Sequence, residues 1–198
     1  MMGLRLIIGI FLLAGLSVGF RKPELCPKRI PHKEYFDVKK MFGIWYSHYR
    51  TRTQGNQTLN CVRSHVRDDV DDGLYIKTYY QFPKNNSIVI QRAKIYGLES
   101  SGYFRTRKLV WKYEKLPRKY SEHWVIDTDY KSYRISFNCK NLTSYGRVTG
   151  SQQILLLQTR TKYPTRGLIE KLKGIATKAG LSIEHAFKVD HRNCPLRF

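Results

Sequence analysis

Four cysteines have the widest choice of chemistry in this sequence, because a cysteine can form a disulfide, bind a metal or act as a nucleophile. No two of them have the Cys-x-x-Cys spacing of a zinc or redox motif. An oxidising compartment would join them in two disulfide bonds. Three pairings are possible, and spacing alone does not choose among them. The residues are Cys26, Cys61, Cys139 and Cys194.

Histidines and carboxylates give little indication of an active site. His48, His65 and His123 are isolated on expected strands, without a paired carboxylate or a second histidine at a catalytic or metal-binding spacing. The acidic segment 68–73 lacks the later glutamate and the flanking helices of an EF-hand, so we expect a solvated turn there. We therefore predict neither enzyme activity nor a metal site.

Positive charge is the most unusual property of the chain. It has 36 basic and 15 acidic residues, a formal net charge of +21. A field of this size attracts anions, so an anionic membrane surface, a sulfated glycan or an acidic small ligand is an expected partner. No nucleic-acid-binding motif gathers the basic residues, and we expect no nucleic-acid partner. The clusters at 22–33, 105–108 and 118–119 are solvated surface by default.

The first 19 residues have the pattern of a secretory signal peptide. A short positive start is followed by an uncharged apolar run from Leu6 to Phe20, shorter than the roughly 20 residues of a bilayer span. Ser17 and Gly19 have the spacing of a cleavage site, so we expect a secreted domain over 20–198. A secreted chain would also expose N-glycosylation sequons to glycosylation. The sequons begin at Asn56, Asn85 and Asn141.

Eight β segments, rich in Tyr, Val, Ile and Thr, are expected between Gly43 and Gln158. Strands at this spacing, with no helical pattern between them, predict a barrel or a sandwich of hairpins. A closed barrel has no edges and can hold one small ligand. The segments are 43–52, 59–67, 74–82, 87–97, 103–113, 122–127, 131–139 and 152–158.

A single helix is expected after the last of these strands. Thr165 can cap its first turn, and Gly180 stands where a helix usually ends. Its apolar residues, among them Leu168 and Leu172, recur at steps of three and four, so one face must pack against the outside of the sheet. The segment 183–189 is a candidate for a short ninth strand.

Three ordered segments resemble the lipocalin family. They are Gly43-Ile44-Trp45-Tyr46, which opens the first strand, Thr128-Asp129-Tyr130 in a later hairpin, and the segment from Leu155 to Arg160. The resemblance extends from Cys26 to Cys194 and is greatest to the group of apolipoprotein D and the insect bilin-binding proteins. It implies an all-β fold, an eight-stranded antiparallel up-and-down barrel with a C-terminal α-helix packed outside.

The resemblance also implies structural roles for several residues. It pairs Cys26 with Cys139 and Cys61 with Cys194. Trp45 would fill the narrow end of the barrel, and Arg160 would lie across its ring as a cation–π pair. The residues implied in barrel closure are Gly43, Trp45, Thr128, Asp129, Tyr130 and Arg160.

The function implied is binding and transport of a small hydrophobic ligand in the cavity. A lipid, fatty acid, sterol, retinoid or tetrapyrrole would suit this description, and a bilin or lipid could remain bound, although no cofactor is required. The alternatives are a scavenger of anionic mediators and a cationic secreted protein that binds cell-surface glycans. Counting inward-facing positions along the strands predicts a set of lining residues: Ser47, Tyr49, Ile76, Thr78, Tyr80, Trp111, Trp124, Ile126, Tyr133, Ile135 and Phe137.

Overall fold

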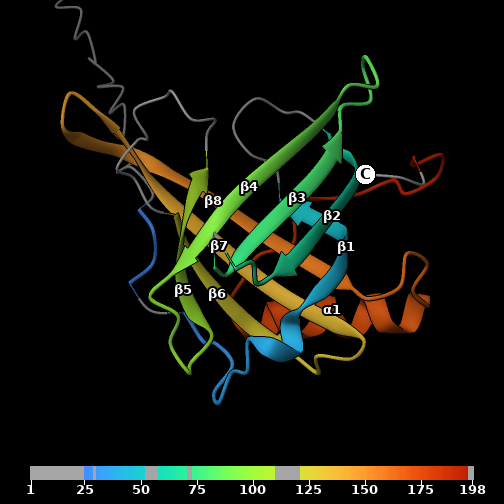
Figure 1. The fold of residues 1–198 in the computed structure, drawn as a ribbon, viewed down its shortest axis with the longest axis horizontal. Coiled ribbons are helices and arrows are strands. Elements are labelled where there is room, and N and C mark those ends of the chain that lie inside the picture. The colour runs from blue at the N-terminus through green and yellow to red at the C-terminus, as the bar shows by residue number, and fades with distance from the viewer. Residues whose placement is uncertain (1–24, 29, 52–57, 71–72, 110–120, 196–198) are drawn as a thin grey trace, which may run out of the picture.

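The computed structural model describes residues 25–28, 30–51, 58–70, 73–109 and 121–195. The strands form one antiparallel sheet in the order β2-β3-β4-β5-β6-β7-β8-β1-β9, and pairing of β1 with β2 closes eight of them into a barrel (Figure 1). This confirms the predicted eight-stranded barrel. The strands are β1 Gly43–Thr51, β2 Asn60–Arg67, β3 Tyr75–Gln81, β4 Ile88–Tyr96, β5 Tyr103–Leu109, β6 Ser121–Thr128, β7 Tyr133–Ser144, β8 Arg147–Thr159 and β9 Ala186–Lys188.

Two helical elements accompany the barrel. A 3-10 turn, η1 Lys39–Met41, precedes β1, and α1 Arg166–Lys178 follows β8. The Thr165 hydroxyl accepts a hydrogen bond from the Leu168 amide at 3.2 Å, the cap expected from the sequence. Gly180 adopts a φ of +75° just after the helix, a conformation that favours glycine and ends the helix.

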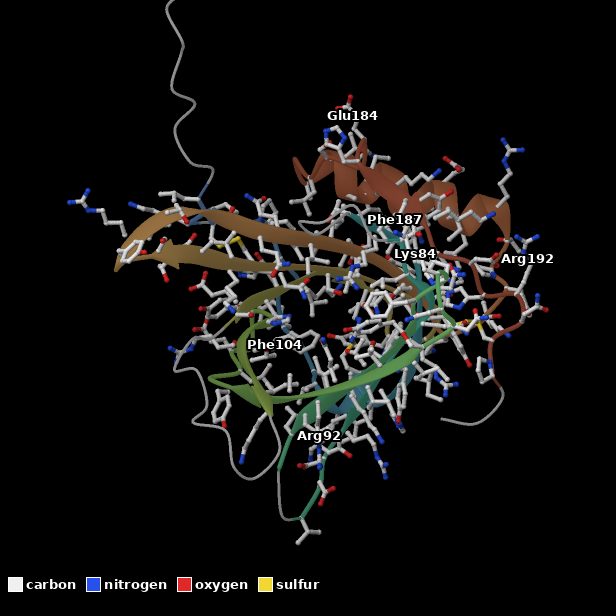
Figure 2. The ribbon with its side chains drawn as sticks, turned by 90° about the horizontal axis from the view of Figure 1, so that it is seen from above. Lys84, Arg92, Phe104, Glu184, Phe187 and Arg192 are labelled. Carbon is white, nitrogen blue, oxygen red and sulfur yellow. A yellow bond between two sulfur atoms is a disulfide. The ribbon has the colours of Figure 1, made fainter. Side chains whose placement is uncertain are left out.

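Helix α1 covers the outer face of β7 and β8 (Figure 2). Leu172 and Ala176 are fully buried there against a cluster that includes Ile135 and Leu157. In the same figure Phe104 lies in the interior, across the β7–β8 layer from α1. Because the helix must remove its apolar stripe from water, the outer face of these two strands is apolar as well.

The β7–β8 hairpin is longer than the sequence pattern predicts. Its pairing continues to Ser144 opposite Arg147, and the end of the hairpin projects beyond the barrel (Figure 1). Tyr145 and Gly146 form the turn with φ values of +46° and +77°, the two left-handed residues of a tight hairpin turn. The polar sequence of the projecting part, without an alternating apolar face, explains why it was not predicted as strand.

Both disulfides fasten an end of the chain to the barrel. Cys26 is joined to Cys139 of β7, and Cys61 of β2 is joined to Cys194, with Cα–Cα distances of 5.6 and 5.5 Å. These are the pairs that the resemblance implied. Each bond links residues more than 100 positions apart, at separations of 113 and 133. The expected signal peptide, Asn56, Trp111 and the cluster 118–119 lie outside the described residues.

Candidate ligand cavity

The narrow end of the barrel is filled by Trp45, whose side chain is completely buried. Its indole Nε1 donates a hydrogen bond to the Met41 carbonyl at 2.8 Å. The guanidinium of Arg160 lies 3.7 Å from the ring centroid, and that of Arg134 lies 4.9 Å from it. One indole therefore contacts two cations through its ring and satisfies its only donor through its edge.

Arg160 is held by backbone oxygens of the loops around the narrow end. Its nitrogens donate to the carbonyls of Phe42 at 2.8 Å, Lys40 at 2.9 Å and Tyr130 at 3.3 Å. Gly43 has a φ of +99°, and a Cβ there would come within 3.1 Å of the Arg160 guanidinium. The position therefore requires glycine both for its backbone conformation and for the close approach.

The hairpin from Asp127 to Tyr133 is closed by its own side chains. The Thr128 hydroxyl donates to the Tyr133 carbonyl at 2.6 Å and accepts from the Tyr130 amide at 2.9 Å. The Asp129 carboxylate accepts from the amides of Ser132 and Tyr133 at 2.7 and 2.9 Å. Burial opposes ionisation of Asp129, but the hydrogen bond from the Ser132 hydroxyl and those from the backbone amides outweigh it and lower its pKa.

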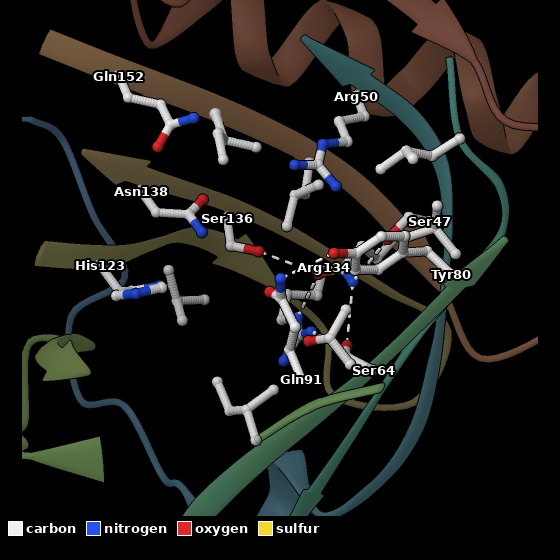
Figure 3. Close-up of a pocket in the computed structure, with 18 of the residues that line it drawn as sticks. Ser47, Arg50, Ser64, Tyr80, Gln91, His123, Arg134, Ser136, Asn138 and Gln152 are labelled. Carbon is white, nitrogen blue, oxygen red and sulfur yellow. Dashed lines mark hydrogen bonds between the residues drawn. The ribbon is translucent and has the colours of Figure 1, made fainter. Parts of the chain in front are cut away.

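A cavity of about 360 Å³ lies within the barrel (Figure 3), and one of its lining residues, Arg134, contacts the Trp45 ring. An adjoining hollow of about 290 Å³ shares part of its wall, including Gln91, His123 and Ile154. The apolar lining residues are Leu59, Val62, Ile76, Phe82, Phe104, Val125, Ile154 and Leu156. The polar ones are Ser47, Arg50, Ser64, Thr78, Tyr80, Gln91, His123, Arg134, Ser136, Asn138, Gln152 and Gln158.

The structure brings four of the predicted lining residues to the cavity: Ser47, Ile76, Thr78 and Tyr80. Six others face away from it, which corrects the expectation that they line it: Tyr49, Trp124, Ile126, Tyr133, Ile135 and Phe137.

An irregularity in β1 explains the error at Tyr49. The pairing of β1 with β8 shifts register between Ser47 and Tyr49, as in a β-bulge. Counting by twos from Trp45 fails beyond that point, because an extra residue reverses the faces of the strand. Arg50 therefore lines the cavity, whereas Tyr49 packs outside, where the Lys173 amino group lies 4.5 Å from its ring.

The errors on β6 and β7 have a different cause. Trp124 and Ile126 of β6 belong to the core that packs under α1, and so do Tyr133, Ile135 and Phe137 of β7. The apolar faces of these two strands therefore point outward. The opposite face presents Arg134 and Ser136 to the cavity. Because a helix covers the barrel here, the more apolar face of the strand is not the interior one. Sequence reasoning missed these polar residues, although their alternation along β7 marks a second face distinct from the apolar one.

A connected hydrogen-bond network forms the floor of the cavity. Gln158, which is 1 % exposed, accepts from Arg134 Nε at 2.8 Å and from the Ser136 hydroxyl at 3.0 Å. Its amide nitrogen donates to the Ser47 hydroxyl at 3.0 Å and to the Ser64 hydroxyl at 3.2 Å. This network fixes the orientation of Arg134 without a carboxylate.

Burial lowers the pKa of each basic group that lines the cavity. It lowers the pKa of Arg134 to about 9, together with the nearby charge of Arg160. Burial also lowers the pKa of Arg50. For His123, burial and then the charge of Arg134 lower the pKa to about 3, so this imidazole is neutral at physiological pH.

Comparison with known proteins identifies relatives by sequence and by fold. No protein-family model matches the chain. Apolipoprotein D of Cavia porcellus is 27% identical over 171 residues, which cover 86% of this chain and 84% of that protein. Apolipoprotein D of Mus musculus is 24% identical over 170 residues, with the same two coverages, 86% and 84%.

Insecticyanin from the tobacco hornworm Manduca sexta superimposes with a TM-score of 0.65 at 14% identity, covering 86% of this chain and 88% of insecticyanin. The chain has the lipocalin fold. The cockroach allergen Per a 4 gives a TM-score of 0.61 at 16% identity, covering 86% of this chain and 98% of the allergen. The resemblance of the three ordered segments therefore agrees with both the relatives found by sequence and the fold of the barrel.

Proposed function

We propose that this protein binds and transports a small hydrophobic ligand in the barrel cavity. The observation that carries the proposal is a cavity whose floor is the network of Arg134 and Gln158 and whose lining residues come from strands all around the barrel. Burial of apolar ligand surface against residues such as Val62, Ile76 and Leu156 would supply affinity, and the polar groups would orient the ligand. A lipid, retinoid, sterol or bilin is a candidate.

We infer that the protein works outside cells. Both disulfides fit an oxidising compartment, and the first 19 residues have the composition of a signal peptide. Asn85 and Asn141 are exposed in the described structure, as glycosylation requires. In the described part of the chain, no helix has the length and apolar character needed to cross a membrane.

We also infer carriage without catalysis. The four cysteines of the chain are all used in disulfides, so none offers a thiol nucleophile. The described residues contain no cluster of three or more histidines, cysteines and carboxylates arranged for a metal. The relatives named apolipoprotein D support the same inference.

Native mass spectrometry and an absorption spectrum of the protein from its source test the carrier function. A bound small molecule is expected, and a visible band would identify a pigment such as a bilin. Ile76→Trp should fill part of the cavity and abolish binding, whereas Ile90→Trp, on an exposed part of β4, should not. A protein that binds nothing from a broad panel of lipids and pigments would contradict the proposal.

A basic groove outside the barrel favours a second candidate function, binding of a sulfated glycan. It lies beside the start of α1 and β9, and Lys162, Arg166 and Lys188 line it without an ion pair to any described carboxylate. Each of its two acidic lining residues is already paired: Asp190 with Arg192, another lining residue, at 2.8 Å, and Glu170 with Lys173 at 3.0 Å. Retention on heparin above physiological salt, lost in Lys162→Gln/Lys188→Gln, is the expected result. Unchanged retention in this variant would exclude the groove.

A further inference from the structure

The barrel cavity contains cations but no carboxylate among its described lining residues. Arg50 enters from β1 and Arg134 from β7, while His123 is neutral. Ion pairs are stronger in such a partly desolvated space than at the surface, because the effective dielectric constant is lower. The interior is therefore suited to an anionic group, provided that one of its cations is free to bind it.

Arg134 is not the free cation. It is 6 % exposed, and it donates to Gln158 Oε1 at 2.8 Å and to the Ser64 hydroxyl at 2.9 Å. The Trp45 ring lies near its guanidinium. These partners are neutral, so they orient Arg134 but leave its positive charge without a counterion from the described residues. Arg134 thus contributes a fixed positive potential at the cavity floor.

Arg50 is the cation with unused donors. Its guanidinium is directed from β1 into the cavity, toward the side where the Tyr80 hydroxyl lies (Figure 3). No residue in the described part of the chain gives it a hydrogen bond or an ion pair. A planar guanidinium of this kind can bind both oxygens of a carboxylate at once. A half-buried arginine without a partner also gains more from an anion than an arginine in water does.

The Tyr80 hydroxyl provides a second donor on the same side of the cavity. It accepts a hydrogen bond from Gln91 Nε2 at 2.7 Å, so its own proton is free to be donated. Burial raises the pKa of Tyr80, opposed by the charge of Arg50, and the phenol stays protonated at physiological pH. The two side chains line the same cavity and differ in role, Arg50 as a cation and Tyr80 as a neutral donor.

We propose that the cavity selects a small apolar acid, whose carboxylate binds the Arg50 guanidinium and the Tyr80 hydroxyl. This inference rests on the proposed carrier function and specifies its ligand class. The apolar body of the acid would lie against Val62, Ile76 and Leu156. A monoanion fits better than a dianion, because Arg50 is the lining arginine with free donors, whereas Arg134 already uses donors in the floor network.

Matched fluorescent probes test the proposal: parinaric acid, a fatty acid, and its methyl ester, which has the same chain without the charge. The acid should bind with a stoichiometry of one per protein. Its affinity should be at least about tenfold higher than that of the ester, as expected for a charge-assisted hydrogen bond. The preference should persist from low to physiological salt, because a pair inside the barrel is screened little. Equal affinity for acid and ester would overturn this inference alone. Failure of both probes to bind would contradict the carrier function as well.

Variants separate the cavity from the basic surface. Arg50→Gln should lower the affinity for the acid about tenfold and leave the affinity for the ester unchanged. Tyr80→Phe should weaken acid binding by a few-fold, which provides a second test in a nearly isosteric variant. The control is Arg67→Gln, the same loss of charge at an exposed position of β2. If Arg67→Gln weakens the acid as much as Arg50→Gln does, surface attraction explains the preference and the inference is wrong.

Discussion

The two ends of the barrel interior use arginine in opposite ways. At the narrow end, Arg160 lies on the Trp45 ring and donates to several backbone carbonyls. In the cavity, Arg50 has no hydrogen-bond partner among the described residues. An arginine whose donors are satisfied by the chain stabilises the fold, whereas one with free donors is available to a ligand. Satisfaction of donors, more than burial, distinguishes the structural arginine from the binding one.

The largest expected effect tests the narrow end. Trp45→Ala should destabilise the protein by about 3 to 5 kcal/mol, because it leaves a cavity where a completely buried indole was packed. Denaturant unfolding monitored by circular dichroism measures the change. Trp45→Phe should cost less, since it keeps a ring beneath Arg160. A loss below about 1 kcal/mol for Trp45→Ala would show that the narrow end is not a main source of stability.

A smaller loss of stability is expected at Arg160. Arg160→Ala should cost about 2 kcal/mol, since it removes a cation–π contact and leaves the partly buried carbonyls of Phe42 and Tyr130 without this donor. The affinity for parinaric acid should not change, because Arg160 does not line the cavity. Arg166→Ala, at an exposed position of α1, is the matched control for denaturant unfolding. If Arg160→Ala lowered the affinity for parinaric acid without lowering stability, Arg160 would be a binding residue and the distinction between the two ends would be wrong.

The stability of the fold should also depend on pH, because His123 in the cavity wall is protonated at different pH values in the folded and unfolded chain. His123 has a folded pKa of about 3, below its unfolded value of 6.5, mainly because it is buried. The unfolded chain therefore binds a proton first as the pH falls, and stability that is present above pH 6.5 is lost toward pH 3. Between pH 6.5 and 5 the loss should be about 1 to 2 kcal/mol. His123→Gln should flatten this slope in denaturant unfolding at several pH values, and an unchanged slope would exclude His123 as its source.

The smallest expected effect is on stability at Arg50. Arg50→Gln should change the free energy of unfolding by no more than about 0.5 kcal/mol, or raise it, because it removes a half-buried charge without breaking a described hydrogen bond. Thermal unfolding of the ligand-free variant measures this. A loss comparable to that of Arg160→Ala would show that Arg50 has a structural partner and would remove the contrast with the narrow end.

Sequence patterns could predict the barrel because its local signals agree with its packing. The alternation of β3 places Ile76, Thr78 and Tyr80 on the cavity side as expected. The Thr165 cap and the apolar stripe of α1 likewise depend only on neighbouring residues. The disulfide pairs followed from family resemblance, since spacing left three pairings open.

The cavity lining was harder to predict, because it depends on what covers each strand. A β-bulge near Tyr49 reverses the faces of β1, and no residue type at that position predicts the bulge from the sequence. On β7, the apolar residues Ile135 and Phe137 pack in the core beneath α1, while Arg134 faces the cavity. Polarity along a strand indicates two faces, but only the position of the helix decides which one is inside.

The two disulfides have a consequence for the covalent connectivity of the protein. The chain segments that they span overlap, since Cys61 lies between Cys26 and Cys139, while Cys194 lies beyond both. A single peptide-bond cleavage anywhere between Cys26 and Cys194 therefore leaves the two fragments tied by at least one disulfide. A protein cleaved once in a surface loop would migrate as one species without reductant and as two with it. This crossed linkage therefore keeps a nicked barrel in one piece.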